Sequence, residues 1–338
     1  MTSERTRRRP TIDDVADVAG VSRGTVSRVL NGGHWVSPDA HASVTAAIKQ
    51  VGYRINPHAR TLATSRTNTV AFLLTEPHHL LFEDPNFSVL MRSAAAALDA
   101  HDVSLVLIMA SNQDEQRRAV QFVGEGHVDG VLLVSSHANS RAFLKDIQRV
   151  GVPTIACGIP LGFERKFGYV AADDQSGAQT AVEYLLERGR RTVGHIAGPE
   201  DTPGGIARLA GYRAAMGEAF DERLVVAGDY GRASGAAAMR ELLDREPGLD
   251  AVFAGNDRMA AAAIEVLRGA GRRVPEDVAV VGFDDAPVAQ DTEPPLTTMR
   301  QPFERISREM VRLLLEEIDG EPPATMVVPT QLVERASA

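Results

Sequence analysis

Apolar positions near the N-terminus recur at the spacing of an α-helix. Four of them stand at i, i+3, i+4 and i+7 and therefore share one helix face. They are Ile12, Val15, Ala16 and Ala19. Thr11 can cap this helix together with Asp14 three residues on, and Gly20 can end it. The pattern predicts a first helix over residues 12–19.

Two more short helices follow. Ser22 can cap the second, which runs to about Leu30 and ends at an Asn-Gly-Gly sequence. Ser37 can cap the third, with Pro38 at its first helical position. Two short helices joined by a tight turn and braced by a third are typical of a helix-turn-helix, whose second helix reads the major groove of DNA. Its outward-facing residues are Ser22, Arg23, Gly24, Ser27 and Arg28. A three-helix module for another partner is the alternative.

From residue 69 the pattern changes to short apolar runs that alternate with amphipathic helical stretches. The runs are TVAFLLTE, VSLVLIMA, VDGVLLVSS, VPTIACG, TVGHIAG, DAVFAGND and DVAVVGFDD. Strands that alternate with helices are typical of parallel sheets built from βαβ units. This region is too long for one sheet of ordinary size, so we expect two α/β subdomains.

Polar residues follow these runs, at the edge of a parallel sheet where ligands bind. The residues expected at this edge are Glu76, Ser135, Gly158, Asp173, Gly198, Asn256 and Asp284. Arg208 adds a planar set of donors, and Tyr230 adds an aromatic face for a sugar ring or a base. We therefore predict a site for a small molecule rich in hydroxyl or amide groups. For any single residue a helix cap is the alternative, since Asp173 and Asp284 stand just ahead of helical stretches.

Charge divides the chain at the same place. Residues 1–66 hold 10 Lys and Arg and 5 Asp and Glu, which is +5, so the net charge of −9 leaves −14 for residues 67–338. A basic head on an acidic body indicates that the head meets a polyanion such as DNA. The sequence has no membrane-spanning run of about 18 apolar residues and no apolar signal core, and its lone Cys157 cannot form an intrachain disulfide. These features predict a cytoplasmic protein.

The segments TIDDVADVAGVSRGTVSRVLNG, VSP and GYRINPHARTLA, with the motifs of the body, resemble the LacI/GalR family of bacterial transcription regulators nearly from end to end. The resemblance implies an α/β fold with an N-terminal helix-turn-helix head, joined by a hinge to a two-subdomain core of parallel sheets like that of periplasmic binding proteins. We expect the head at 1–55, the hinge at 56–66 and the core at 67–338. The first subdomain is expected at 67–167 plus 297–325, and the second at 168–296 plus 326–336.

The resemblance also implies a function. A homodimer, most often a repressor, binds a near-palindromic operator in double-stranded DNA and is controlled by a small-molecule effector in the cleft of the core. Arg23, Gly24 and Arg28 are then base-reading positions, and Leu62 enters the minor groove at the centre of the operator. The predicted DNA-binding residues are Thr11, Ser22, Arg23, Gly24, Thr25, Ser27, Arg28, Asn31, Tyr53, Asn56, Ala59, Arg60 and Leu62. The predicted effector-binding residues are Phe82, Ser135, Asp173, Arg208, Tyr230, Asn256 and Asp284.

Two positions depart from the family pattern. Gly24 has no side chain with which to read a base, and Gly158-Ile159 stands where many relatives have polar residues, so we expect a less polar or differently seated effector. A sugar is expected, with a purine-type corepressor as the alternative. An enzyme or an exported solute-binding protein on the same scaffold is less favoured, because the chain has no phosphate-binding or nucleophile motif and begins with a helix-turn-helix. No metal or cofactor is expected.

Overall fold

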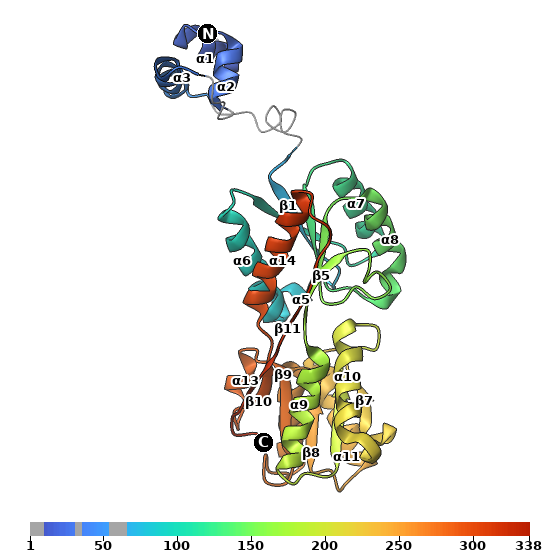
Figure 1. The fold of residues 1–338 in the computed structure, drawn as a ribbon. Coiled ribbons are helices and arrows are strands. Elements are labelled where there is room, and N and C mark those ends of the chain that lie inside the picture. The colour runs from blue at the N-terminus through green and yellow to red at the C-terminus, as the bar shows by residue number, and fades with distance from the viewer. Residues whose placement is uncertain (1–9, 31–35, 54–65) are drawn as a thin grey trace, which may run out of the picture. The chain divides into compact units, whose positions relative to one another are not determined.

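The computed structural model describes residues 10–30, 36–53 and 66–338, which divide into two units, residues 1–67 and 68–338. The first unit consists of three helices (Figure 1). They are α1 (Ile12–Ala19), α2 (Arg23–Leu30) and α3 (Pro38–Val51). Val15 of α1, Val26 of α2 and Val44 of α3 are fully buried against one another, so a small apolar cluster fixes the angles between the helices.

The caps that the sequence predicts are present in this unit. Thr11 donates its backbone N–H to the Asp14 carboxylate at 2.6 Å, and its hydroxyl accepts from the Asp14 N–H, which completes the capping box. Gly20 ends α1 at a φ of 67°, a left-handed conformation that glycine adopts without strain. The Ser37 hydroxyl caps α3. The three predicted helices are therefore confirmed.

The second unit contains two six-stranded sheets, each covered by helices on both faces (Figure 1). The first sheet has the order β11-β5-β4-β3-β1-β2 and is parallel throughout. Its strands are β1 (Thr69–Leu74), β2 (Ser104–Met109), β3 (Gly130–Val134), β4 (Thr154–Cys157), β5 (Gly168–Ala172) and β11 (Thr325–Val328). Its helices are α5 (Leu80–Glu83), α6 (Pro85–Asp99), α7 (Gln113–Gly124), η1 (Ala138–Ser140), α8 (Arg141–Val150) and α14 (Phe303–Ile318).

Side chains alternate between the two faces of this sheet, as the period of a strand requires. Val70 and Phe72 of β1 pack against α6 and α14, whereas Ala71 and Leu73 pack against α7 and α8. Both faces are buried, which explains why the strands appear in the sequence as continuous apolar runs.

The second sheet repeats this strand order as β12-β10-β9-β8-β6-β7, with β12 antiparallel to β10 and the other pairs parallel. Its strands are β6 (Val193–Ala197), β7 (Val225–Ala227), β8 (Ala251–Ala254), β9 (Ala279–Asp284), β10 (Thr297–Arg300) and β12 (Gln331–Val333). Its helices are α9 (Asp174–Glu187), α10 (Pro203–Met216), η2 (Gly217–Ala219), η3 (Glu222–Leu224), α11 (Arg232–Arg245), α12 (Asp257–Gly269) and α13 (Val288–Asp291).

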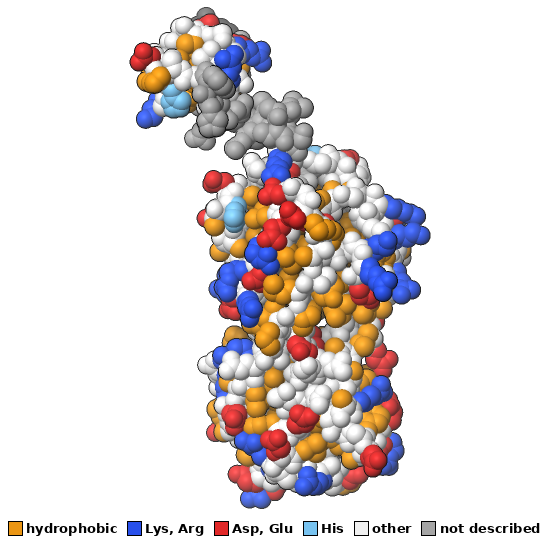
Figure 2. Space-filling model, in the orientation of Figure 1, with side chains coloured by type: hydrophobic (Ala, Val, Ile, Leu, Met, Phe, Trp, Pro, Cys, Tyr) orange, Lys and Arg blue, Asp and Glu red, His pale blue; other side chains and the backbone are white. Residues whose placement is uncertain are grey.

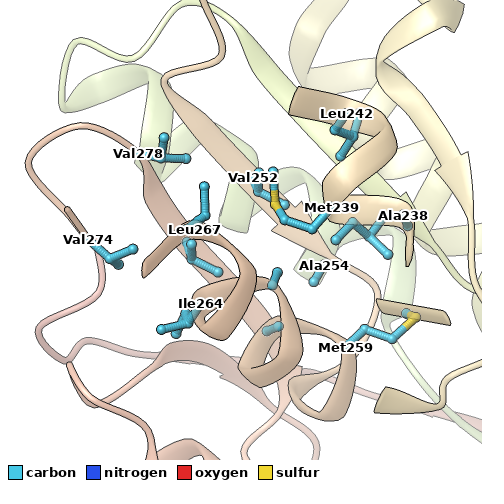
Figure 3. Close-up of a cluster of buried hydrophobic side chains, with 14 of the residues drawn as sticks. Ala238, Met239, Leu242, Val252, Ala254, Met259, Ile264, Leu267, Val274 and Val278 are labelled. Atoms are coloured by element: carbon cyan, nitrogen blue, oxygen red, sulfur yellow. The ribbon is translucent and has the colours of Figure 1, made fainter. Parts of the chain in front are cut away.

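One face of the second sheet packs against α11 and α12 through small and flexible side chains. Figure 3 shows Met239 and Leu242 of α11 and Ile264 and Leu267 of α12 packed together with Val252 of β8. The opposite face packs against α9 and α10. Each sheet therefore has its own core, and the second unit consists of two subdomains.

All seven predicted runs form strands, but the predicted subdomain boundaries need correction. Residues 168–172 form β5, which pairs with β4, so they belong to the first subdomain and not to the second. Residues 297–300 form β10, which pairs with β9 in the second sheet, and β11 lies in the first. The boundary depends on which strands pair with each other, and the pattern along the sequence does not reveal that pairing.

The chain passes between the two sheets at three places: between β5 and α9, between β10 and α14, and between β11 and β12 (Figure 1). The surface of the second unit mixes both charges. On the face drawn in Figure 2, acidic and basic side chains alternate over the second subdomain. No helix among the described residues is long and apolar enough to span a membrane.

Candidate functional site

A cavity of about 180 Å³ lies where the carboxyl ends of both sheets meet. Residues of both subdomains line it, including Ser135 after β3 and Asp284 at the end of β9. A larger outer chamber of about 740 Å³ shares Glu76, Phe87 and Tyr230 with it. The two chambers form one cleft at the sheet edges where α/β proteins bind ligands.

Five of the seven predicted effector residues line the inner cavity: Ser135, Arg208, Tyr230, Asn256 and Asp284. The other two do not. Phe82 lies on the short helix α5 with 86 % of its surface exposed, outside the lining of the cavity, whereas Phe87 of α6 lines it. Asp173 caps α9 by accepting from the Ser176 N–H at 3.1 Å, and its neighbour Asp174 faces the cavity.

Arg208 is the centre of a buried group of charges. It lies on α10 with 6 % of its surface exposed. Its Nε donates to Asp174 Oδ1 at 2.9 Å, and a second guanidinium nitrogen lies 3.6 Å from Asp284 Oδ1. The guanidinium also donates to the Gly255 carbonyl. Burial alone would lower the pKa of Arg208, but the carboxylates around it raise it above its ordinary value, so this cation is permanent.

The guanidinium of Arg208 also lies over two aromatic rings. Its carbon is 3.9 Å from the centre of the Phe283 ring and 5.8 Å from that of Tyr230. Cation–π contact of this kind orients the N–H donors of the guanidinium and holds the group against the wall of the cavity.

Asp284 connects the two subdomains. Its carboxylate accepts from Asn86 Nδ2 of α6 at 3.0 Å and from Gln301 Nε2, next to β10, at 2.5 Å. Burial raises its pKa to about 7, although Arg208 opposes the shift. The two oxygens of a carboxylate accept about four hydrogen bonds, so a ligand hydroxyl can still bind to Asp284.

Asn256 and Tyr230 depend on each other. Asn256 caps α12 by accepting from the Met259 N–H at 2.9 Å, and its amide donates to the Tyr230 carbonyl at 3.0 Å. The side chain of Asn256 is therefore already engaged, and it sets the position of Tyr230. The Tyr230 hydroxyl lies 3.3 Å from the Thr202 hydroxyl at the border of the two chambers.

Six described residues other than glycine have a positive φ, and three of them line this cleft. Among the described residues, Ser135, Tyr230 and Asp284 have φ angles of 60°, 66° and 109°, a region that residues other than glycine rarely adopt. Such conformations cost on the order of 1–3 kcal/mol each and persist mostly where binding or catalysis requires them. Three predicted effector residues are thus held in strained positions.

The sequence pattern misses several lining residues. Asn86 and Gln301 are brought to Asp284 by the crossings between subdomains, which no local pattern reveals. Ser136 follows Ser135, is 4 % exposed, and its hydroxyl has no hydrogen-bond partner although it borders the cavity. A buried hydroxyl without a partner is costly, and a bound ligand can supply one.

The second helix of the first unit exposes the residues predicted to contact DNA. Ser22, Arg23, Gly24 and Arg28 are exposed, and the Arg23 side chain, at 70 % exposure, lies 3.8 Å from Asp13. Thr11, Thr25 and Ser27 are half-buried, and Tyr53 packs against the three-helix core. The predicted residues Asn31, Asn56, Ala59, Arg60 and Leu62 lie outside the described residues.

Comparison with known proteins gives this arrangement a context. Residues 11–56 match the model of the bacterial regulatory proteins of the lacI family, and residues 182–338 match the periplasmic binding protein-like domain. The HTH-type transcriptional regulator CelR of Thermobifida fusca is 46 % identical over 337 residues, which cover 98 % of this chain and 99 % of that protein. The chain belongs to the lacI family.

Solved structures of this family have the same fold. The structure of a transcriptional regulator CelR–cellobiose complex is 44 % identical, covers 98 % of this chain and 100 % of its own, and gives a TM-score of 0.77. The lac repressor dimer bound to operator and the anti-inducer ONPF is 25 % identical, with coverage of 98 % and 99 % and a TM-score of 0.85. This lacI-family protein is a DNA-binding transcriptional regulator with a two-subdomain effector core.

Proposed function

We propose that this protein is a repressor that binds a near-palindromic operator as a homodimer, and that cellobiose or a similar β-linked disaccharide sets its operator affinity. The observation that carries the proposal is the likeness, over nearly the whole chain, to a CelR–cellobiose complex. This likeness favours a sugar over a purine. The division of the cleft into an inner and an outer chamber fits a ligand of two rings.

The lining of the cleft suits a sugar. Hydroxyl groups both donate and accept, and the cleft offers the Arg208 guanidinium, the Ser136 hydroxyl and the Asp284 carboxylate. Phe87 and Tyr230 offer apolar faces for the C–H side of a pyranose ring. This mixture of an apolar lining with a few placed polar groups is typical of small-molecule sites.

Because both subdomains line the cleft, a bound sugar favours one angle between them. That angle sets the spacing of the operator-binding segments of the two protomers. The coupling between the two sites is reciprocal, so bound operator also changes the affinity for the sugar. The exposed Arg23 and Arg28 contact base edges, and Leu62 inserts at the operator centre, as the family resemblance implies. The sugar is bound and released unchanged, and the protein acts in the cytoplasm with its DNA.

Titration calorimetry of the full chain with cellobiose, ribose and hypoxanthine tests the effector. We expect binding of cellobiose at least tenfold tighter than of the other two, and chromatography should recover the sugar intact. Fluorescence anisotropy with operator and random DNA, with and without cellobiose, tests the coupling. Equal operator affinity in the presence and absence of every ligand that binds would overturn the proposal.

A further inference from the structure

A histidine that lines the outer chamber contacts carboxylates of both subdomains. His137 follows β3 and precedes η1. Its Nε2 lies 2.9 Å from Glu76 Oε1, and its Nδ1 lies 3.1 Å from Asp201 Oδ2. Since a carboxylate only accepts, an imidazole between two carboxylates forms both hydrogen bonds only when both its nitrogens carry protons.

The two carboxylates belong to different halves of the core. Glu76 follows β1 in the first subdomain, and Asp201 precedes α10 in the second. A backbone bond from the Ala138 N–H to the Asp201 carbonyl, 2.8 Å long, crosses the same boundary. The Ser135 hydroxyl donates to Glu76 Oε1 as well, so the carboxylate that lines both chambers is held from two sides.

We infer that His137 is a positioning residue of the cleft, which as an imidazolium ties Glu76 of the first subdomain to Asp201 of the second and thereby holds the cleft closed on its ligand. The inference rests on the proposed function in taking a sugar as that ligand. A ligand that needs the closed form binds in proportion to the fraction of protein that is closed. Loss of the tie therefore weakens binding without removing any direct contact to the sugar.

The protonation of His137 follows from its neighbours. The hydrogen bond to Glu76 is the largest cause that raises the pKa of His137 to about 9, burial opposes it, and Asp201 adds to it. Other titratable or charged groups lining the outer chamber besides Tyr230 are His79, Glu83, Asp84, Asp229, Arg232 and Arg258. When the cleft opens, the pKa of His137 returns toward its usual 6.5. The imidazolium therefore stabilises the closed form fully below about pH 6.5, and this stabilisation is lost as the pH rises through about 9.

Calorimetric titration of the full chain with cellobiose from pH 7.5 to pH 10 tests the tie. His137→Gln keeps the size and one donor but carries no charge, and we expect about three- to tenfold weaker binding at pH 7.5, since these groups are partly exposed. Wild-type affinity should fall toward that of the variant above pH 9. The matched control is His127→Gln, whose histidine pairs with Glu125 at 3.2 Å on the surface and should behave as wild type. An affinity and pH profile of His137→Gln equal to wild type would overturn the inference.

A ligand-free experiment separates failure of this tie from failure of the sugar assignment. Thermal midpoints of wild type, His137→Gln, Asp201→Asn and the double variant form a cycle at pH 7.5. If the tie exists, the thermal midpoint of the double variant falls by clearly less than the sum of the decreases in the two single variants. The reason is that either change alone breaks the same contact. Additive losses would refute the tie. If wild type binds no tested sugar, the effector proposal fails while the cycle still decides the role of His137.

Discussion

The two units of this protein use arginine in opposite ways. In the first unit Arg23 and Arg28 lie exposed on α2, and Arg23 lies 3.8 Å from Asp13, whose side chain is exposed as well. In the core Arg208 is almost completely buried, and two carboxylates and a backbone carbonyl surround it. Surface pairs contribute little to folding, whereas a buried charge that loses a partner is costly.

This difference predicts how the two sites respond to mutation. The exposed Arg23 and Arg28 can change with little effect on stability, because their side chains are not part of the core. Residues in the cleft also hold the two subdomains together, so their loss changes folding and binding at once.

The largest effect is expected for Arg208→Met. This change leaves Asp174 and Asp284 buried without their cation, which should lower the free energy of unfolding by about 3–5 kcal/mol and abolish sugar binding. Urea denaturation of the full chain, with calorimetry for the sugar, measures both. The control is Arg149→Met, which breaks an exposed pair with Asp146 and should cost at most about 1 kcal/mol. If Arg208→Met is as stable as the wild type, the buried arginine contributes no more to folding than the exposed ones, and the contrast between the two units is wrong.

Arg28→Ala should act on DNA binding alone. We expect a loss of about 1–3 kcal/mol in operator binding and much less on random DNA, because a bidentate base contact discriminates between sequences. The melting temperature should stay within about one degree of wild type, as expected for an exposed residue. Anisotropy titrations on both DNAs, with Lys49→Ala on α3 as the control, test this. Equal losses on operator and random DNA would mean that Arg28 contacts phosphate only.

Asp284→Asn should remove a pH dependence from the cleft. Because burial raises the pKa of Asp284 to about 7, its contribution to stability is complete below its unfolded pKa and is lost as the pH rises through about 7. Sugar affinity should rise severalfold over the same interval, since the carboxylate accepts hydrogen bonds more strongly than the acid. Calorimetry between pH 6 and pH 8 should show that this rise in affinity is absent from the variant. If the sugar affinity of the variant depends on pH as that of the wild type does, the titrating group is not Asp284.

Gly24→Ala should have the smallest effect. The added methyl group would lie 3.7 Å from the Ser22 hydroxyl, an ordinary contact, and alanine favours the helix by up to about 1 kcal/mol. Stability should therefore rise slightly, while preference among operators that differ at one base pair shifts. Melting curves and binding to a set of single-base operator variants test both. Destabilisation would show that α2 has no room for a side chain there.

Local patterns predicted the elements of the protein, and pairing between distant segments determined the rest. The caps at Thr11 and Ser37 and all seven apolar runs are where the sequence indicates, because capping and period-two burial depend on nearby residues. The sequence does not tell which of Asp173 and Asp174 lines the cleft, since a carboxylate at the start of a helix can either cap it or face the cleft. Asn86 and Gln301 meet Asp284 only after the chain has crossed between sheets. No property of their neighbours in sequence indicates that meeting.

The three crossings between the subdomains also limit how this regulator can be redesigned. Asp174 begins the helix after the first crossing, and Gln301 lies within the second, so two lining residues of the cleft are parts of the joint itself. A change made there to admit a different ligand is therefore expected to alter the stiffness and resting angle of the joint as well. Engineering a new effector specificity at these two positions is therefore expected to shift the operator affinity of the ligand-free protein too, whereas Ser136 lies in none of the three crossings.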